Sequence, residues 1–344
     1  MSRRSLTLII ASIGVIAALA IAVLIPVPYV ILGPGPTLNT LGKASSGQPL
    51  ITIVGHPTYP TTGHLNLVTV GYQGGPGVTI NIFSALAAWL NPHEAVVPES
   101  ELFAPGQTQQ QTQRQDTQQM TGSQQDAVAA ALTELHIPFQ TQVVVVQAQP
   151  GYPAYGVLKS GDVITAVDGA PVTRQSGLTS LIGAHPAGTT LTLTILRNGR
   201  SQKVQVGTKE SGGRPVMGVQ VMTQFNFPFT VKFSVGDIGG PSAGTMFALG
   251  IIDKLTPMNL TGGKFIAGTG EITPSGQVQA IGGIQQKMVG ARDAGATIFL
   301  APASNCSDVK GAIPAGLRVV KVSTLGQAVT YLQDIKAGQP VPSC

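Results

Sequence analysis

An uncharged apolar stretch near the N-terminus places the strongest limit on how this chain of 344 residues can fold. Leu6 to Ile25 contains no charged residue, and about 20 apolar residues are enough for a helix to cross the hydrocarbon core of a bilayer. A cleaved signal peptide would have a shorter apolar stretch and small residues after it, whereas Pro26 to Tyr29 follow here. We therefore expect an uncleaved transmembrane helix, with a cleaved signal peptide as the alternative.

The basic residues around this stretch predict its orientation. Arg3 and Arg4 precede it, and the next basic residue is Lys43. Because basic residues favour the cytoplasmic side, we expect a single-pass protein of the cell membrane with a cytoplasmic N-terminus and an extracytoplasmic remainder. Cys306 and Cys344, the two cysteines, both fall in that outer part, where an oxidising environment favours a disulfide between them. Two unpaired thiols are the alternative.

Composition argues against several classes of function. Charged residues make up 10% of the chain, and the net charge of +5 is spread without any run of Lys or Arg, so no nucleic-acid partner is expected. The histidines stand singly and no His-Glu-x-x-His occurs, so no metal site is predicted. The glycine-rich loop that holds ATP phosphates is absent too. We expect a folded protein without a cofactor.

Residues 31–138 are predicted to form a first globular region. A β-type run at 50–54 is followed by a second at 64–70, which alternates apolar and polar residues as a half-buried strand does. Residues 105–125 are rich in Gln and Thr and almost lack apolar side chains, which predicts a mobile surface loop. A strong helix-forming pattern then begins, with Ser123 as its predicted N-cap.

Residues 139–209 are predicted to form a compact β-rich unit. The blocks Gly-Asp-Val-Ile at 161–164 and Asp-Gly-Ala-Pro-Val at 168–172 precede a predicted hairpin with Asn198-Gly199 at its turn. In combination these blocks resemble bacterial PDZ domains. Such domains add an extended peptide to an exposed sheet edge and hold its terminal carboxylate with backbone N–H groups.

The resemblance implies a peptide-binding groove in this unit. Leu178, Leu181 and Ile182 would line it from its helix. The usual Gly-Leu-Gly-Phe-like loop that binds the carboxylate is not recognisable before Val143, so capture of a carboxyl terminus does not follow from the sequence. A structural spacer that binds no peptide is the alternative.

The third region, 210–344, contains the block Gly-Gly-Pro-Ser-Ala-Gly at 239–244. Glycines around Ser242 let a substrate approach closely, and the apolar run after it predicts a helix whose N-terminal N–H groups lie beside the serine. The nucleophile elbow of α/β-hydrolases has the same Gly-x-Ser-x-Gly pattern but needs a histidine after the serine. Every histidine here precedes Ser242, so a different base is required.

Two later blocks indicate which base. Gly-Thr-Gly-Glu-Ile-Thr occupies 268–273, and Ile-Gly-Gly-Ile-Gln-Gln-Lys occupies 281–287. Together with Pro-Ser-Ala-Gly, in this order and spacing, these blocks resemble the Lon peptidase domain over residues 225–335. The strand at 64–70 and the helix from Ser123 resemble earlier parts of that domain, so the PDZ-like unit would be an insertion within it.

The resemblance implies a Ser–Lys dyad, with Ser242 as nucleophile and Lys287 as general base. Thr269 would support the lysine, and Gly240 would belong to the loop that binds the oxyanion. A lysine acts as a base only when neutral, so its pKa has to fall from about 10.4 toward neutrality, and burial is the expected cause. Lon has Lys-Asp-Gly before Pro-Ser, whereas this loop lacks the acid and Asp237 lies two positions early.

The sequence thus predicts an α+β fold with an N-terminal transmembrane helix within 1–30. A Lon-type peptidase domain would comprise 31–138 and 210–344, with a PDZ-like domain inserted at 139–209. The predicted function is an ATP-independent, membrane-anchored serine endopeptidase that cleaves segments of exported or membrane proteins through an acyl-enzyme. The alternative is a catalytically silent scaffold whose PDZ groove holds a partner at the membrane. Lon-like domains often form rings, which leaves a homo-oligomer open.

Overall fold

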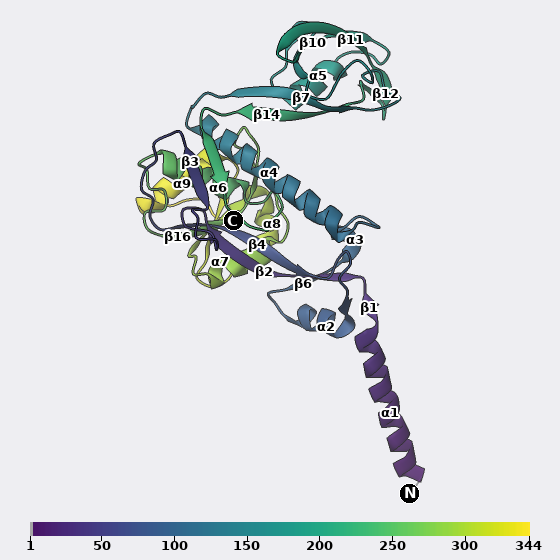
Figure 1. Cartoon of the computed structure of the whole chain (residues 1–344). Helices are drawn as coiled ribbons and strands as arrows, with labels where there is room; N and C mark the ends of the chain where they lie inside the picture. The colour runs from purple at the N-terminus through teal and green to yellow at the C-terminus, as the bar shows by residue number, and fades with distance from the viewer. Residues whose placement is uncertain (1–2) are drawn as a thin grey trace. The chain divides into compact units, whose positions relative to one another are not determined.

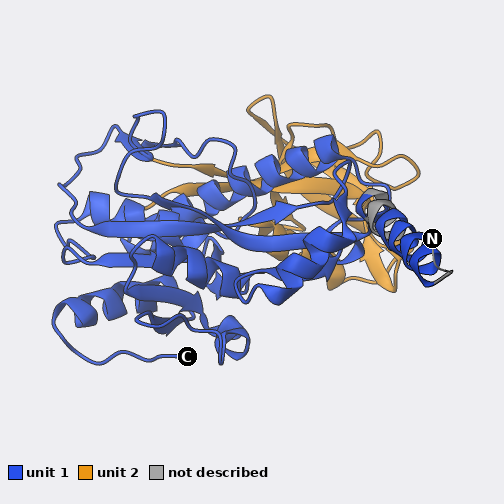
Figure 2. Cartoon of the chain, turned by 90° about the horizontal axis from the view of Figure 1, so that it is seen from below, with its two compact units in different colours: residues 1–137, 229–344 blue, residues 138–228 orange. Residues whose placement is uncertain are grey.

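The computed structural model describes the backbone of residues 3–344, and the side chains of residues 3, 18–22 and 24 are not described. The protein is of mixed α and β structure and divides into two compact units (Figures 1 and 2). Unit 1 comprises Met1–Ile137 and Phe229–Cys344, and unit 2 comprises Pro138–Pro228. Unit 2 is therefore an insertion into the sequence of unit 1.

Unit 1 is built on a mixed six-stranded sheet with the order β20-β19-β16-β4-β2-β6. Its central strand β16 pairs in parallel with β19 and β4, β20 continues the parallel part, and β2 pairs antiparallel with β4 and β6. The strands are β2 (Tyr29–Asn39), β4 (His64–Gln73), β6 (Ala95–Pro98), β16 (Phe265–Gly268), β19 (Ile298–Pro302) and β20 (Arg318–Val322).

Helices α6 (Gly244–Leu255), α7 (Ile284–Asp293) and α9 (Leu325–Lys336) pack against this sheet, and α4 (Gln109–Glu134) packs on α6 and α9. Ala267 of β16 belongs to the apolar core that α7 forms, whereas a Cβ added to Gly268 would meet Met246 of α6. Successive strand residues face opposite sides of a sheet. Helices α6 and α7 therefore lie on opposite faces, and both approach the carboxyl end of β16.

The other elements of unit 1 are shorter or lie at its edges. Helix α4 packs against α6 and against β17. The short pairs are β1 with β5, β3 with β15, and β17 with β18. The bounds are α1 (Arg3–Leu24), β1 (Pro26–Val27), β3 (Ile51–Val54), β5 (Ile80–Asn81), α2 (Ile82–Leu90), α3 (Glu99–Leu102), β15 (Thr230–Phe233), β17 (Glu271–Ile272), β18 (Val278–Gln279) and α8 (Cys306–Val309).

The predicted mobile loop at 105–125 is wrong, because most of it belongs to α4. The helix begins after Thr108, whose side chain and that of Gln111 form a reciprocal capping box. Its exposed positions carry glutamines, which favour helix, and its inner face needs only scattered small or apolar residues such as Met120 and Ala127, both buried. A low apolar content was therefore a poor guide to disorder here. Ser123 lies inside this helix and is not its N-cap.

Unit 2 contains a five-stranded antiparallel path, β11-β10-β8-β7-β14, with α5 beside it. The compact unit extends to Pro228, beyond the end predicted at 209. The reason is that β14 pairs along its length with β7, a contact between distant parts of the sequence. Its elements are β7 (Gln140–Ala148), β8 (Val163–Val167), β9 (Ala170–Pro171), α5 (Gln175–Gly183), β10 (Thr190–Arg197), β11 (Arg200–Gly207), β12 (Lys209–Ser211), β13 (Arg214–Val216) and β14 (Val219–Asn226).

The predicted transmembrane segment, 6–25, coincides closely with helix α1. Within the described part of the chain, however, no helix combines the length and the apolar character needed to span a bilayer. Part of the predicted segment, 18–22 and 24, falls on side chains outside the described ones.

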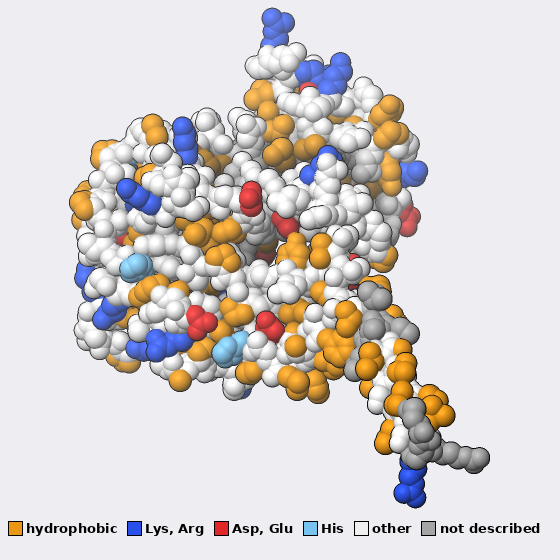
Figure 3. Space-filling model, turned by 60° about the horizontal axis from the view of Figure 1, so that its bottom comes forward, with side chains coloured by type: hydrophobic (Ala, Val, Ile, Leu, Met, Phe, Trp, Pro, Cys, Tyr) orange, Lys and Arg blue, Asp and Glu red, His pale blue; other side chains and the backbone are white. Residues whose placement is uncertain are grey.

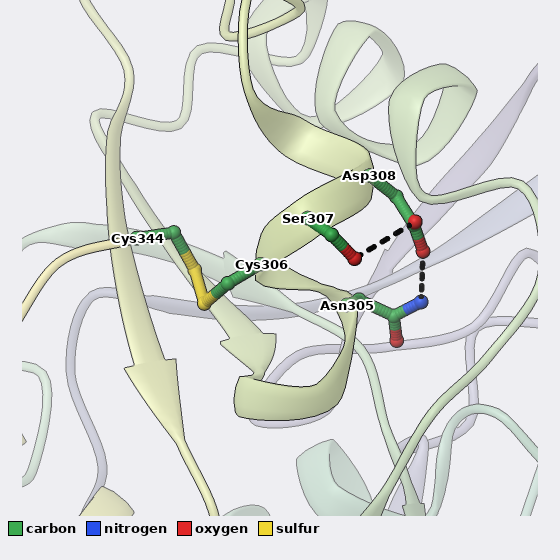
Figure 4. The surroundings of a disulfide bond; sticks show 5 residues. All are labelled: Asn305, Cys306, Ser307, Asp308 and Cys344. Carbon is green, nitrogen blue, oxygen red and sulfur yellow. Dashed lines mark hydrogen bonds between the residues drawn. A yellow bond between two sulfur atoms is a disulfide. The ribbon is translucent and has the colours of Figure 1, made fainter.

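A disulfide joins Cys306, at the start of α8, to Cys344, the last residue (Figure 4). The tail that carries Cys344 runs beside β20, where Ser343 bridges to Val320. Next to Cys306, the amide group of Asn305 exchanges two hydrogen bonds with the backbone of Ile281, at 2.9 and 3.0 Å. The disulfide-linked segment therefore also holds the loop that leads into α7.

Candidate active site

Ser242 lies in the loop between β15 and α6, directly before the first turn of α6. Its carbonyl oxygen accepts hydrogen bonds from the Gly270 N–H at 2.8 Å and from the Thr269 hydroxyl at 3.0 Å. Both donors follow the carboxyl end of β16. The helix start on one side and the central strand on the other thus fix the backbone of this serine.

Lys287 lies in the first turn of α7, on the other face of the sheet. Its Nζ is 2.8 Å from Ser242 Oγ and 3.3 Å from Thr269 Oγ1. Gly283 starts this helix with φ 66°, and a Cβ there would lie 2.7 Å from a methyl carbon of Val70. Only glycine allows both that backbone angle and that close approach, so this position decides where α7 begins and where Lys287 points.

The lysine side chain is almost removed from solvent, with 4% of its surface exposed. Burial lowers the pKa of Lys287 to about 8, because an ammonium group loses its hydration in an apolar surrounding. A substantial fraction of this amine is therefore neutral near physiological pH. An amine in that state, at hydrogen-bond distance from a serine hydroxyl, can accept its proton.

Thr269 connects the two groups. It is fully buried, its N–H donates to Leu300 of β19, and its hydroxyl donates to the Ser242 carbonyl. The remaining lone pairs of the hydroxyl oxygen face the lysine amine, so a hydrogen from Nζ has an acceptor there. Thr269 therefore orients the amine toward Ser242 Oγ. The role implied for this threonine by the sequence resemblance fits the geometry.

Gly240 lies in the loop before Ser242, and its N–H already has a backbone acceptor. Its N–H donates to the backbone carbonyl of Asp116 in α4 at 3.1 Å, so this N–H is already used in the structure. A Cβ added to Gly239 would lie 2.5 Å from the Cβ of Asp116, which shows how tightly the loop rests on α4. By contrast, the N–H of Ser242 has no acceptor among the described residues. It is thus one of the donors in this loop that remain available for an oxyanion.

Helix α4 contributes a residue whose role the sequence analysis missed. Ser123 is buried, and its hydroxyl donates to the carbonyl of Pro241, the residue before the nucleophile, at 2.8 Å. Met120, Ser123 and Ala127 follow a helical spacing of three and four, and all three are buried. This spacing was visible in the sequence and would have placed Ser123 on the inner face of a longer helix.

The dyad opens into a cavity of about 710 Å³ within unit 1. Asp116 of α4, Asp237 before the nucleophile loop and Glu271 of β17 line its wall, so acidic groups surround the site although the loop itself lacks the Lon aspartate. Burial raises the pKa of Asp116. Burial and, secondarily, the charge of Asp116 raise the pKa of Tyr72, another lining residue. The described residues contain no group of three side chains able to bind a metal ion.

Unit 2 has its own groove, a cavity of about 310 Å³ between α5 and the free edge of β14. Leu178 and Ile182 line it as expected, whereas Leu181 packs against the core of the unit and is absent from the lining. The backbone enters β14 through Met217 and Gly218, where φ is 72°. A loop of this kind, directly before the edge strand, is where a peptide carboxylate would be held.

In this unit the loop that borders the groove precedes β14 and not β7, the strand that contains Val143. The strand that borders the groove is the last strand of the unit and not an early one. Because a different chain order can give the same arrangement of strands, the position of a motif in the sequence did not reveal its position in the fold.

Comparison with known proteins adds to this geometry. Residues 234–333 match the family model for the Lon protease (S16) C-terminal proteolytic domain, a segment that contains Ser242, Thr269 and Lys287. The chain contains a Lon-type serine peptidase domain. That domain belongs to a class of enzymes with a Ser–Lys dyad. A second family model, PDZ domain, matches residues 111–208.

Relatives of the Lon-type domain are bacterial proteases. The Lon protease of Neorickettsia sennetsu is 34% identical over 106 residues, which are 30% of this chain and 12% of that protein. Lon protease 1 of Bacillus subtilis is 34% identical over 95 residues, 27% of this chain and 12% of the relative. The Lon protease of Clostridioides difficile is 48% identical over 63 residues, 18% of this chain and 8% of the relative. The chain thus spans about an eighth or less of the length of these relatives.

Among solved structures, the PDZ domain of an SdrC-like protein from Listeria innocua is 22% identical, covering 23% of this chain and 92% of that chain, with a TM-score of 0.22. The corresponding domain from Listeria monocytogenes gives 22% identity, 23% and 85% coverage, and the same TM-score. The PDZ family match starts inside α4, whereas the compact unit starts at Pro138. We follow the compact unit, because α4 packs in unit 1 and β14 completes the sheet of unit 2.

Proposed function

We propose that this protein is an ATP-independent serine endopeptidase in which Ser242 is the nucleophile and Lys287 the general base. The observation that carries the proposal is the 2.8 Å contact between Lys287 Nζ and Ser242 Oγ, together with the burial that lowers the pKa of the lysine to about 8. The match to the Lon-type proteolytic domain over these residues supports it.

In the proposed reaction, neutral Lys287 takes the proton of Ser242 Oγ while the oxygen attacks the carbonyl carbon of a peptide bond. The negative charge that develops on the carbonyl oxygen is bound by the Ser242 N–H at the start of α6, where the helix dipole also favours an anion. The protonated lysine then gives its proton to the leaving amine as the C–N bond breaks. Water attacks the resulting ester, with Lys287 again acting as base, and releases the acid product and free Ser242.

Membrane attachment is a second part of the proposal. Helix α1 exposes large apolar side chains along the described part of its length, for example Leu8 at 69% and Ile16 at 65% (Figure 3). The sequence from Ser5 to Gly42 carries no charge, and Arg3 and Arg4 precede it. These features support an anchored protein with a cytoplasmic N-terminus and an extracytoplasmic catalytic unit. The disulfide between Cys306 and Cys344 agrees with an oxidising compartment.

The groove of unit 2 completes the proposal. An extended peptide would add to the free edge of β14, with side-chain contacts to Leu178 and Ile182 of α5. Proteins or peptides with extended segments are thus the proposed substrates, those of exported or membrane proteins first among them. A ring-shaped homo-oligomer, as in Lon-like domains, stays a prediction.

The test is cleavage of unfolded casein by the purified full-length protein without ATP. We expect Ser242→Ala and Lys287→Ala each to reduce turnover at least a thousandfold, and the double variant to be no worse than either, because the two residues act as one unit. The control variant Lys310→Ala removes an exposed lysine instead of the buried one and should keep full activity. Turnover by either dyad variant would reject the assignment. If the wild type binds peptides but never cleaves them, the scaffold alternative is correct.

A further inference from the structure

Helix α2 exposes its bulky apolar side chains, whereas a helix on the surface of a water-soluble protein ordinarily buries them. Its inner face consists of Ala85 and Ala88, which are buried against Ile31 and Ile80 in a small apolar core. Its outer face carries the large residues, which are Ile82, Phe83, Leu86, Trp89 and Leu90, with exposed fractions from 36% to 75%. The two most exposed are Trp89 at 72% and Leu90 at 75%.

The outer face of α2 carries no charged residue. The sequence from residue 65 to residue 92 contains no Asp, Glu, Lys, Arg or His, and α2 has neither acidic residues in its first turn nor basic residues in its last. A surface helix of a globular protein ordinarily turns charged or polar residues outward, and a contiguous exposed apolar patch marks a contact with another apolar surface. The side of α2 away from the core thus has the composition of an interface.

The fold places this helix beside the end of α1. Strand β1 follows α1 directly and pairs with β5, with Pro26 opposite Asn81 and Val27 opposite Ile80. Asn81 is also the N-cap of α2, its side chain accepting from the Ser84 N–H at 2.9 Å. Helix α2 therefore begins at the point where the chain leaves α1, and the two helices are in contact. In Figure 3, apolar side chains gather where α1 meets the rest of unit 1.

We propose that the outer face of α2 lies on the lipid bilayer, with Trp89 and Leu90 inserted at the level of the head groups. This inference rests on the membrane attachment within the proposed function. A bilayer is the partner whose chemistry matches: it is apolar, it adjoins the exposed apolar surface of α1, and its interface is where tryptophan side chains preferentially lie. The polar backbone of α2 is satisfied within the helix, and its other face is held by the protein.

Lipid contact at α2 fixes the orientation of unit 1 at the membrane. A helix that only crosses the bilayer lets an attached domain rotate and tilt, whereas a second contact beside it removes most of that freedom. The catalytic cavity would then stand in one orientation toward the membrane surface. Substrate segments close to the bilayer would reach Ser242 more readily than segments far from it.

Trp89 is the only tryptophan of the chain, so its fluorescence reports on α2 directly. The full-length protein would be reconstituted into phosphatidylcholine and phosphatidylglycerol vesicles, with and without brominated acyl chains. Trp89 emission would be measured together with its quenching by aqueous iodide. We expect a shift of the emission to shorter wavelength, quenching by brominated lipid of at least half the signal, and at least threefold protection from iodide.

The matched control moves the tryptophan to Tyr59, in the double variant Trp89→Phe with Tyr59→Trp. Tyr59 is 46% exposed and precedes β4, whereas α2 follows the other end of that 10-residue strand, which is about 33 Å long. This tryptophan should be quenched by iodide and unaffected by brominated lipid. In a second variant, Leu86→Gln with Leu90→Gln, quenching of Trp89 by brominated lipid should fall at least twofold.

Three results would overturn the inference, and flotation of the protein with the vesicles separates it from the anchor. If the protein floats but Trp89 responds to iodide and not to brominated lipid, α2 faces water and the anchor stands. If the protein floats and neither quencher reaches Trp89, α2 contacts another protein copy. If the protein does not float, membrane attachment fails, and this inference fails with it.

Discussion

The pH dependence of the reaction at Ser242 follows directly from the environment of Lys287. The perturbation is the pH of the solution, and the signal is the rate at which a small phosphonate probe modifies Ser242. Because burial lowers the pKa of Lys287 to about 8, about 1% of the amine is neutral at pH 6 and about half at pH 8. The rate of modification should therefore rise about 50-fold between these two pH values and level off above pH 9.

A lysine with its ordinary pKa of about 10.4 would give a different curve, because the rate would keep rising about tenfold per pH unit up to pH 10. The assay is stopped-flow or mass-spectrometric measurement of probe incorporation into full-length protein from pH 5.5 to 10.5. Intrinsic reactivity of the probe toward hydroxide is subtracted with the Ser242→Ala variant.

A plateau near pH 9 supports the buried amine as the base. Two curves would refute the reasoning. A rate that rises without levelling to pH 10 means that the amine is not desolvated in solution as it is in the structure. A rate that is flat from pH 6 to 9 means that Lys287 does not take the proton.

Three further predictions concern neighbouring groups. Thr269→Val removes the hydroxyl that bonds the Ser242 carbonyl and faces the amine, so kcat/KM should fall at least tenfold with unchanged circular dichroism. Lys287→Met should stabilise the fold by up to about 3 kcal/mol at pH 7 in urea unfolding. The reason is that, between pH 8 and 10.5, the lysine binds a proton more readily in the unfolded state than in the folded state. The stability gained by Lys287→Met should therefore shrink as the pH rises through that range. Burial, and then the charge of Glu271, raises the pKa of Asp126 to about 6, so this carboxyl costs stability increasingly from about pH 4 to 6. Asp126→Asn should be the more stable protein at pH 8 and lose that advantage at pH 3.

The parts of the site that the sequence could predict are those encoded by short continuous motifs. Gly-Thr-Gly at 268–270 and the glycines before Lys287 encode local backbone shapes, and these shapes bring the dyad together at the end of β16. The position of α6 after Ser242 followed from its apolar run for the same reason. Local chemistry thus determined the predictable part of the site.

What could not be predicted depends on contacts between distant segments. Strand β14 belongs to unit 2 only because it pairs with β7, about eighty positions earlier, and no local pattern carries that information. The N–H of Gly240 is occupied by Asp116 because α4 packs across the loop. The helical state of 109–125, by contrast, is encoded locally, by its capping box and by its glutamines, which favour helix.

Helix α2 shows a further limit to what the sequence could predict. Its apolar residues would ordinarily be assigned to a core, and nothing in their spacing distinguishes a core-facing side from an exposed one. The small Ala85 and Ala88 face the protein, where they pack with Ile31 and Ile80 in one buried cluster. Only the packing in the structure shows that the large residues remain outside.

The central claim is that Lys287 activates Ser242 for acylation, and one measurement tests it most directly. The full-length protein would be treated at pH 8 with a peptidyl phosphonate, and the adduct would be located by peptide mass spectrometry in wild type, Lys287→Ala and Lys310→Ala. The account predicts a single adduct on Ser242 in wild type and Lys310→Ala, and at least a hundredfold less in Lys287→Ala. An adduct on another residue, or equal modification of Ser242 without Lys287, would contradict it.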